Sequence, residues 1–150
     1  MAIKVGDAAP NFSLPTQSGE TVSLSQFKGQ KPVVLYFYPK DDTPGCTVES
    51  CSFRDSYEAF KDLGAEVIGI SSDSVESHQK FANKHNLPFI LASDRGSKTR
   101  QAYDVPATLG LLPGRVTYVI DPEGVVKHVF NSQFNPKAHI AEALTVLKGL

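Results

Sequence analysis

The sequence has few cysteines, almost no net charge and no long apolar run. Its 150 residues contain two cysteines, too few for a secreted scaffold held together by disulfides. The formal net charge of −1 gives no sign of a partner such as nucleic acid or an acidic membrane surface. No apolar run approaches the roughly 20 residues of a membrane span. Residues 1–7 resemble neither a signal nor a transit peptide, so we expect a protein that stays where it is made, or a mature form.

Apolar segments alternate between strand and helix patterns along a chain whose length suits one domain, residues 1–150. Strands are predicted at 33–37, 66–70, 89–91, 116–120 and 125–130, the last two forming a hairpin around a Pro- and Gly-containing turn. Helices are predicted at 46–63, 74–86, 98–103 and after Pro136, and residues 108–114 read as a loop. This order predicts an α/β fold with a central mixed sheet and helices on both faces. Residues 12–14 and 22–24 add a small N-terminal β-hairpin.

The two cysteines, Cys46 and Cys51, lie together just after Pro44 and Gly45, where a helix should begin. A thiol in the first turn of a helix meets unpaired backbone N–H groups and the positive end of the helix dipole, which favour the reactive thiolate. Two buried, inert cysteines are one alternative. A metal site is another, but it needs about four ligands, and the nearest histidine is His78. We favour a redox pair that needs neither metal nor cofactor.

The spacing of the cysteines restricts their chemistry. Four residues separate them, unlike the C-x-x-C motif of thioredoxin-type reductants. In an ideal helix, positions five apart are rotated by roughly 140° and lie roughly 8.7 Å apart between Cα atoms. A disulfide tolerates at most about 6.8 Å. We therefore expect a disulfide between them to require unwinding of the first helical turns.

The run Pro39-x-x-x-Thr43-x-x-Cys46 resembles the active-site signature of the peroxiredoxin family. Residues 38–47 with Cys51 resemble its atypical two-cysteine branch, called bacterioferritin comigratory protein or peroxiredoxin Q. Residues 5–12 and 114–121 extend the likeness over nearly the whole chain. The resemblance implies a thioredoxin-like fold and thiol-dependent reduction of hydrogen peroxide and organic hydroperoxides, as part of antioxidant defence.

The resemblance also implies roles for the cysteines. The Cys46 thiolate would attack the peroxide and become a sulfenic acid. Cys51 would then form an intramolecular disulfide, which thioredoxin or a similar dithiol reductant would reduce. A resolving cysteine in the same chain removes the need for a dimer, so a monomer is expected.

The resemblance implies that four residues bind the peroxide: Thr43, Pro44, Gly45 and the distant Arg115. Arg115 would supply a fixed positive charge and hydrogen-bond donors, and Thr43 would orient the peroxide through its hydroxyl. Pro39 would cover the sulfur and limit water, while leaving it accessible to a small oxidant.

The other polar residues are expected to have ordinary roles. Glu49 reads as a structural acid in the first helical turn, and Asp41 as part of a solvated rim. Arg54 and Asp55 read as a surface ion pair. The four histidines, His78, His85, His128 and His139, are expected at the surface or partly buried.

Two rival functions use the same thiols: a redox sensor or chaperone that acts on client proteins, and a thiol–disulfide oxidoreductase. Peroxide turnover separates the first from an enzyme, and the absent C-x-x-C motif opposes the second. Two locations stay open. The cytoplasm is expected, but residues 108–115 and 131–136 resemble chains of chloroplasts and cyanobacteria, so the alternative is a chloroplast protein without its transit peptide.

Overall fold

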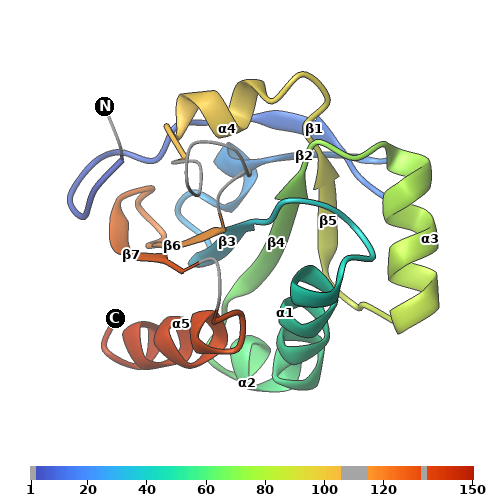
Figure 1. The fold of residues 1–150 in the computed structure, drawn as a ribbon. Coiled ribbons are helices and arrows are strands. Elements are labelled where there is room, and N and C mark those ends of the chain that lie inside the picture. Colours follow the sequence, from blue (N-terminus) through green and yellow to red (C-terminus); the bar gives the residue numbers. More distant parts are fainter. Residues whose placement is uncertain (1–2, 106–114, 133–134) are drawn as a thin grey trace.

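A five-stranded mixed sheet forms the centre of the molecule (Figure 1). The computed structural model describes residues 3–105, 115–132 and 135–150, so the predicted loop 108–114 lies outside the described residues. In the order β5-β4-β3-β6-β7, β3 is parallel to β4 and antiparallel to β6. The strands are β3 (Val33–Phe37), β4 (Glu66–Ser71), β5 (Ile90–Ser93), β6 (Val116–Ile120) and β7 (Val126–Asn131). The expected N-terminal hairpin is β1 (Ser13–Pro15) with β2 (Thr21–Ser23).

The helices match the predictions except in the first segment. They are α1 (Pro44–Asp55), α2 (Tyr57–Asp62), α3 (Val75–His85), α4 (Lys98–Ala102) and α5 (Ala138–Lys148), with a 3₁₀ turn at Leu24–Phe27. The single helix predicted at 46–63 is wrong in two ways. It begins at Pro44, where proline has no N–H to lose. It also breaks at Ser56, whose φ and ψ of −102° and 4° lie outside the helical region.

Helix α2 ends at Asp62, close to the stop predicted at Gly64. Gly64 adopts a φ of +74°, a conformation that costs glycine little. Its N–H donates to Lys61 O, and the Ala65 N–H donates to Phe60 O. This pair of bonds is a Schellman motif, which satisfies the last carbonyls of the helix and turns the chain into β4.

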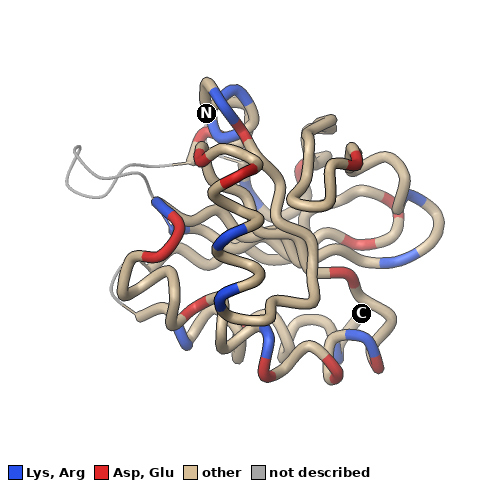
Figure 2. The backbone as a smooth tube through the Cα atoms, turned by 90° about the vertical axis from the view of Figure 1, so that its right-hand side faces the viewer, with Lys and Arg blue, Asp and Glu red and all other residues tan. Residues whose placement is uncertain are grey.

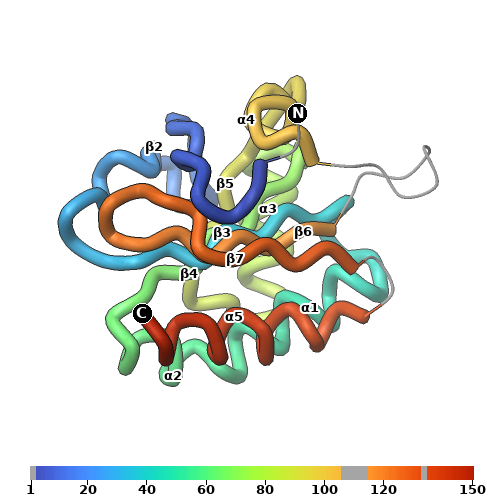
Figure 3. Tube along the Cα trace, turned by 90° about the vertical axis from the view of Figure 1, so that its left-hand side faces the viewer, coloured from blue at the N-terminus to red at the C-terminus, as the bar shows by residue number. Residues whose placement is uncertain are grey.

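Two apolar clusters cover the two faces of the sheet. Alternate residues of β3 explain the division: Tyr36 faces a cluster with α1, α2, α3 and α5, whereas Leu35 faces one with the N-terminal hairpin and the end of α4. Figures 1 and 3 show α1, α2 and α5 on one side of the sheet and the N-terminal segment with α4 on the other. Helices therefore lie on both faces as predicted, but most of them pack on the face of Tyr36.

Charged residues of both signs are interspersed along the chain (Figure 2). Among the described residues, no helix is long and apolar enough to cross a membrane. The fold places the C-terminal end of β3 beside the start of α1 and the start of β6, and this edge of the sheet carries the predicted site.

Candidate active site

Cys46 occupies the third position of α1, so the fold places it in the first helical turn as predicted. The N–H groups of a first turn have no carbonyl one turn earlier. The helical hydrogen bonds begin with the Thr47 N–H, which donates to Thr43 O at 2.8 Å. The N–H groups of Gly45 and Cys46 precede this bond. They are donors suited to a developing negative charge on sulfur or oxygen.

Arg115 reaches this turn from a distant part of the sequence. It directly precedes β6, whose Val116 pairs with Phe37 at the end of β3. Its Nη2 donates to Cys46 Sγ at 3.3 Å. A guanidinium at this distance stabilises a thiolate more than a thiol. The sheet register thus brings together two residues that are 69 positions apart.

Gly45 is needed for this approach. A Cβ added at position 45 would lie 3.0 Å from Arg115 Nη2. The guanidinium would then have to move away from the sulfur. The absence of a side chain at position 45 therefore allows Arg115 to lie against the first turn of α1.

The sulfur is less accessible than the sequence suggested. Cys46 is only 1% exposed, so the sulfur expected to be covered by Pro39 yet accessible to a small oxidant is almost fully enclosed. It packs within the apolar cluster that includes Tyr36 and Phe53. These surroundings exclude bulk water from the sulfur.

The loop before α1 holds Pro39 and Thr43, both half-buried. Thr43 is at the N-cap position, but its hydroxyl donates to Lys40 O at 2.8 Å and makes no capping bond to α1. From α4, Arg100 Nη2 donates to Tyr38 O at 2.9 Å, just before Pro39. No sequence pattern pointed to Arg100, because its bond to Tyr38 O depends on how α4 packs against the end of β3.

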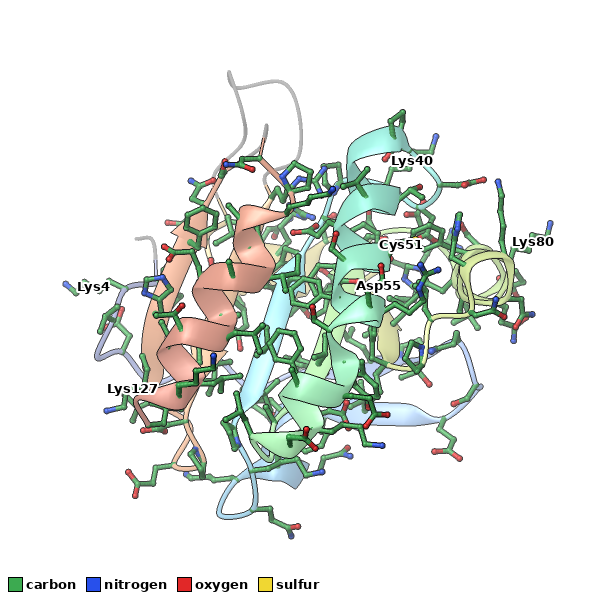
Figure 4. All side chains as sticks on the ribbon, turned by 90° about the horizontal axis from the view of Figure 1, so that it is seen from below. Lys4, Lys40, Cys51, Asp55, Lys80 and Lys127 are labelled. Carbon is green, nitrogen blue, oxygen red and sulfur yellow. The ribbon has the colours of Figure 1, made fainter. Side chains whose placement is uncertain are left out.

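Cys51 is half-buried further along α1, about one turn before Asp55 (Figure 4). Both cysteines are free thiols and both lie within the unbroken helix. The helical geometry keeps their Cα atoms beyond disulfide distance. Arg54 pairs with Asp55 at 3.0 Å, as expected of a surface ion pair. Its Nη1 also donates to His85 O at 2.7 Å, which ties the end of α1 to α3.

Glu49 does not lie in the first helical turn, where the sequence analysis placed it. Because α1 begins at Pro44, Glu49 lies in the second turn, where it is fully buried. Its Oε1 accepts a hydrogen bond from Arg115 Nη1 at 2.6 Å. Burial raises the pKa of Glu49 to about 8, against the lowering effect of Arg115. Glu49 and Cys46 therefore share one guanidinium.

His139 and His78 correct the expectation for the histidines, because both are completely buried. His139, on α5, donates from Nε2 to Ser132 O at 2.8 Å, and its Nδ1 lies 2.7 Å from the Thr117 hydroxyl. Burial lowers the pKa of His139 to about 4. His139 is therefore neutral around pH 7, with its proton on Nε2.

Asp41 is also buried rather than part of a solvated rim. It lies 2.7 Å from His78 Nδ1 and accepts hydrogen bonds from the hydroxyls of Tyr38 and Ser77. His78 Nε2 faces a second acceptor, Ala92 O, at 3.0 Å. His78 thus donates from Nε2 and contacts Asp41 through Nδ1, and these bonds tie the loop before α1 to α3 and β5. Asp73 completes a group of metal-ligating types, but Nε2 of His78 is taken by Ala92 O and its Nδ1 by Asp41.

Replacing Asp41 with asparagine is expected to lower the free energy of unfolding by about 3 kcal/mol, because it removes a buried carboxylate that His78 and the hydroxyls of Tyr38 and Ser77 contact. Asp42→Asn is the matched control. Asp42 pairs with Lys84 at 2.9 Å, but both side chains are more than half exposed, so its loss should be much smaller. Urea unfolding of the two variants measures the difference. Equal losses would contradict a buried hydrogen-bond network at Asp41.

Comparisons with known proteins agree with this geometry. Residues 5–129 match the AhpC/TSA family. The chain is 58% identical over 149 residues to "Peroxiredoxin Q, chloroplastic" of Oryza sativa subsp. japonica, covering 99% of this chain and 68% of the relative. The protein of the same name from Sedum lineare is 59% identical over 146 residues, covering 97% and 78%. This chain belongs to the AhpC/TSA family, as a peroxiredoxin of the Q type. It is therefore a thiol-dependent peroxidase, which acts on a peroxide and uses a thiol reductant.

Solved peroxiredoxins share the fold. Peroxidoxin BcpB from Mycobacterium tuberculosis superposes with a TM-score of 0.90 and 38% identity, over 99% of this chain and 98% of that one. Peroxiredoxin Q from Xanthomonas campestris gives 0.87 and 31%, over 98% and 96%. The expected thioredoxin-like fold and the resemblance to peroxiredoxin Q are thus confirmed.

Proposed function

We propose that Cys46 is the peroxide-reacting residue and that Arg115 and the first turn of α1 stabilise its thiolate. The 3.3 Å contact between Arg115 Nη2 and Cys46 Sγ is the observation that carries this proposal. The thiolate attacks one peroxide oxygen, the O–O bond breaks, and Cys46 becomes a sulfenic acid as hydroxide or alkoxide leaves. Thr43, Pro44, Gly45 and Arg115 surround the attacked peroxide. Pro39 shields the sulfur from water.

In the second step Cys51 attacks the Cys46 sulfenic acid and releases water, leaving a disulfide within the chain. A dithiol such as thioredoxin then reduces the disulfide. Because this cycle needs one chain, the single domain 1–150 acts as a monomer, with neither nucleic acid nor membrane as a partner. The names of the plant relatives support the chloroplast over the cytoplasm as its compartment.

Stopped-flow oxidation by hydrogen peroxide, an alkyl hydroperoxide and a lipid hydroperoxide tests the first step. Mass spectrometry of the product should find one oxygen on Cys46, or a bond between the two cysteines. Cys46→Ser should not react. Oxidation of that variant at the same rate would contradict the assignment.

Formation of the disulfide is expected to unfold the start of α1, because the intact helix holds the two cysteines too far apart. Amide hydrogen exchange across residues 44–56 should be slow in the reduced protein and much faster in the oxidised protein. Residues of α5, which packs beside α1, provide an internal control. Equal, strong protection of 44–56 in both states would refute the unwinding.

A further inference from the structure

Two potential anions contact one guanidinium in the interior of the protein. Arg115 donates to Cys46 Sγ through Nη2 and to Glu49 Oε1 through Nη1. All three residues are buried. If Cys46 and Glu49 were both ionised, the cluster would hold two negative charges and one positive charge, and a surplus buried charge is costly. The contacts therefore favour a state in which one of the two acids is neutral.

The second oxygen of Glu49 shows where a proton would lie. Among the described residues, Glu49 Oε2 is buried and has no hydrogen-bond partner. A carboxylate oxygen in this position would be unsatisfied, which is unfavourable. His139 Nδ1 faces it at 3.5 Å. Because Nε2 of neutral His139 donates to Ser132 O, Nδ1 has no proton to donate to a carboxylate oxygen, and its lone pair already accepts from the Thr117 hydroxyl at 2.7 Å.

We propose that Glu49 carries a proton in the reduced protein and releases it when Cys46 is oxidised. The inference rests on the proposed function and deepens it. The thiolate forms a bond to one peroxide oxygen, the O–O bond breaks, and hydroxide leaves with the electron pair, so that sulfur loses two electrons to the peroxide. Hydroxide takes up one proton and becomes water, and Glu49 gives up one. The negative charge thus passes from Cys46 to Glu49, and Arg115 balances it in both states.

Three other titratable residues approach this cluster, and none of them changes its protonation state near neutral pH. Tyr36 approaches from β3, and burial raises its pKa well above its ordinary value, so it stays neutral. His139 approaches from α5 and is neutral, because burial lowers its pKa to about 4. Arg100 on α4 stays charged, but Asp94 opposes its positive charge more strongly than Cys46 does, so it does not balance the cluster. Cys46 and Glu49 are therefore the groups that exchange charge. Since no contact joins Glu49 to the sulfur, we regard it as a positioning residue that acts through Arg115.

Counting protons during oxidation tests the proposal. The Cys51→Ser protein stops at the sulfenic acid, so one equivalent of hydrogen peroxide in weak buffer with a pH indicator, near neutral pH, isolates the step. With Glu49 present, net proton uptake per sulfenic acid should be close to zero. In Cys51→Ser/Glu49→Gln it should be about one, because hydroxide then takes its proton from solution. Glu58→Gln, an exposed change on α2, is the matched control and should behave as the parent.

Infrared difference spectra of the parent give a second readout that does not depend on the variant. Oxidation should remove a protonated-carboxyl band and produce a carboxylate band. Uptake of about one proton per sulfenic acid in the parent, without loss of that band, would overturn the inference. Zero uptake in both the parent and Glu49→Gln would also overturn it, because Cys46 would then have started as a thiol. Absence of sulfenic acid, by mass spectrometry, would instead refute the proposed function itself.

Discussion

Replacing Cys51 with serine is expected to reduce steady-state peroxide turnover with thioredoxin to background, while a single oxidation of Cys46 proceeds at the parent rate. Cys51 is half-buried and remote from the sulfur while α1 is intact, so it should not influence the first step. The chain has no third cysteine that could replace it. The sulfenic acid would then persist. Stopped-flow oxidation and turnover at excess reductant separate the two steps.

Ser52→Ala is the control for Cys51→Ser, because Ser52 is a half-buried neighbour on the same helix. It should retain turnover. Undiminished turnover in Cys51→Ser at low protein concentration, where no second chain supplies a thiol, would exclude Cys51 as the resolving residue.

Replacing Arg115 with alanine should slow oxidation of Cys46 by at least about a hundredfold, because the thiolate and the developing charge on the leaving oxygen both lose a buried guanidinium. The fraction of Cys46 present as thiolate at neutral pH should fall as well. The rate constant for reaction with hydrogen peroxide measures the first effect, and thiolate absorbance measures the second.

The Arg115→Ala variant needs a control for stability, since it also leaves Glu49 without its cation. The double variant Arg115→Ala/Glu49→Gln also removes the buried carboxyl that has lost its cation, so it should recover folding stability without recovering reactivity. Arg115→Lys keeps the charge but not the two-pronged geometry that reaches Cys46 and Glu49, so its rate should be intermediate. Parent-like reactivity in Arg115→Ala would remove Arg115 from the mechanism.

The fold followed from local patterns in the sequence. The buried run 33–37, the Ser74 cap of α3 and Gly64 each act through neighbouring residues, and each appears in the structure as predicted. The break at Ser56 did not, because the apolar spacing of residues 46–63 continues across it. The starting point at Pro44 mattered more. An error of two residues placed Glu49 in the first helical turn, whereas it lies in the second.

The polar interior was the part that the sequence concealed. Arg115 was expected through its family resemblance, but its bond to Glu49 depends on the register between β3 and β6. His78 and His139 have no distinctive local pattern, and their burial comes from the packing of α3 and α5 against the sheet. Networks of this kind join residues far apart in sequence, so single-sequence patterns contain no signal for them.

The ionisation of Cys46 is the most direct test of the account. Thiolate absorbance of the Cys51→Ser protein, followed as the pH is lowered from alkaline values, reports on this one sulfur. We expect a thiolate signal that depends on the 3.3 Å contact with Arg115, so that Arg115→Ala in the same background loses much of it. Identical absorbance curves with and without Arg115 would contradict the account.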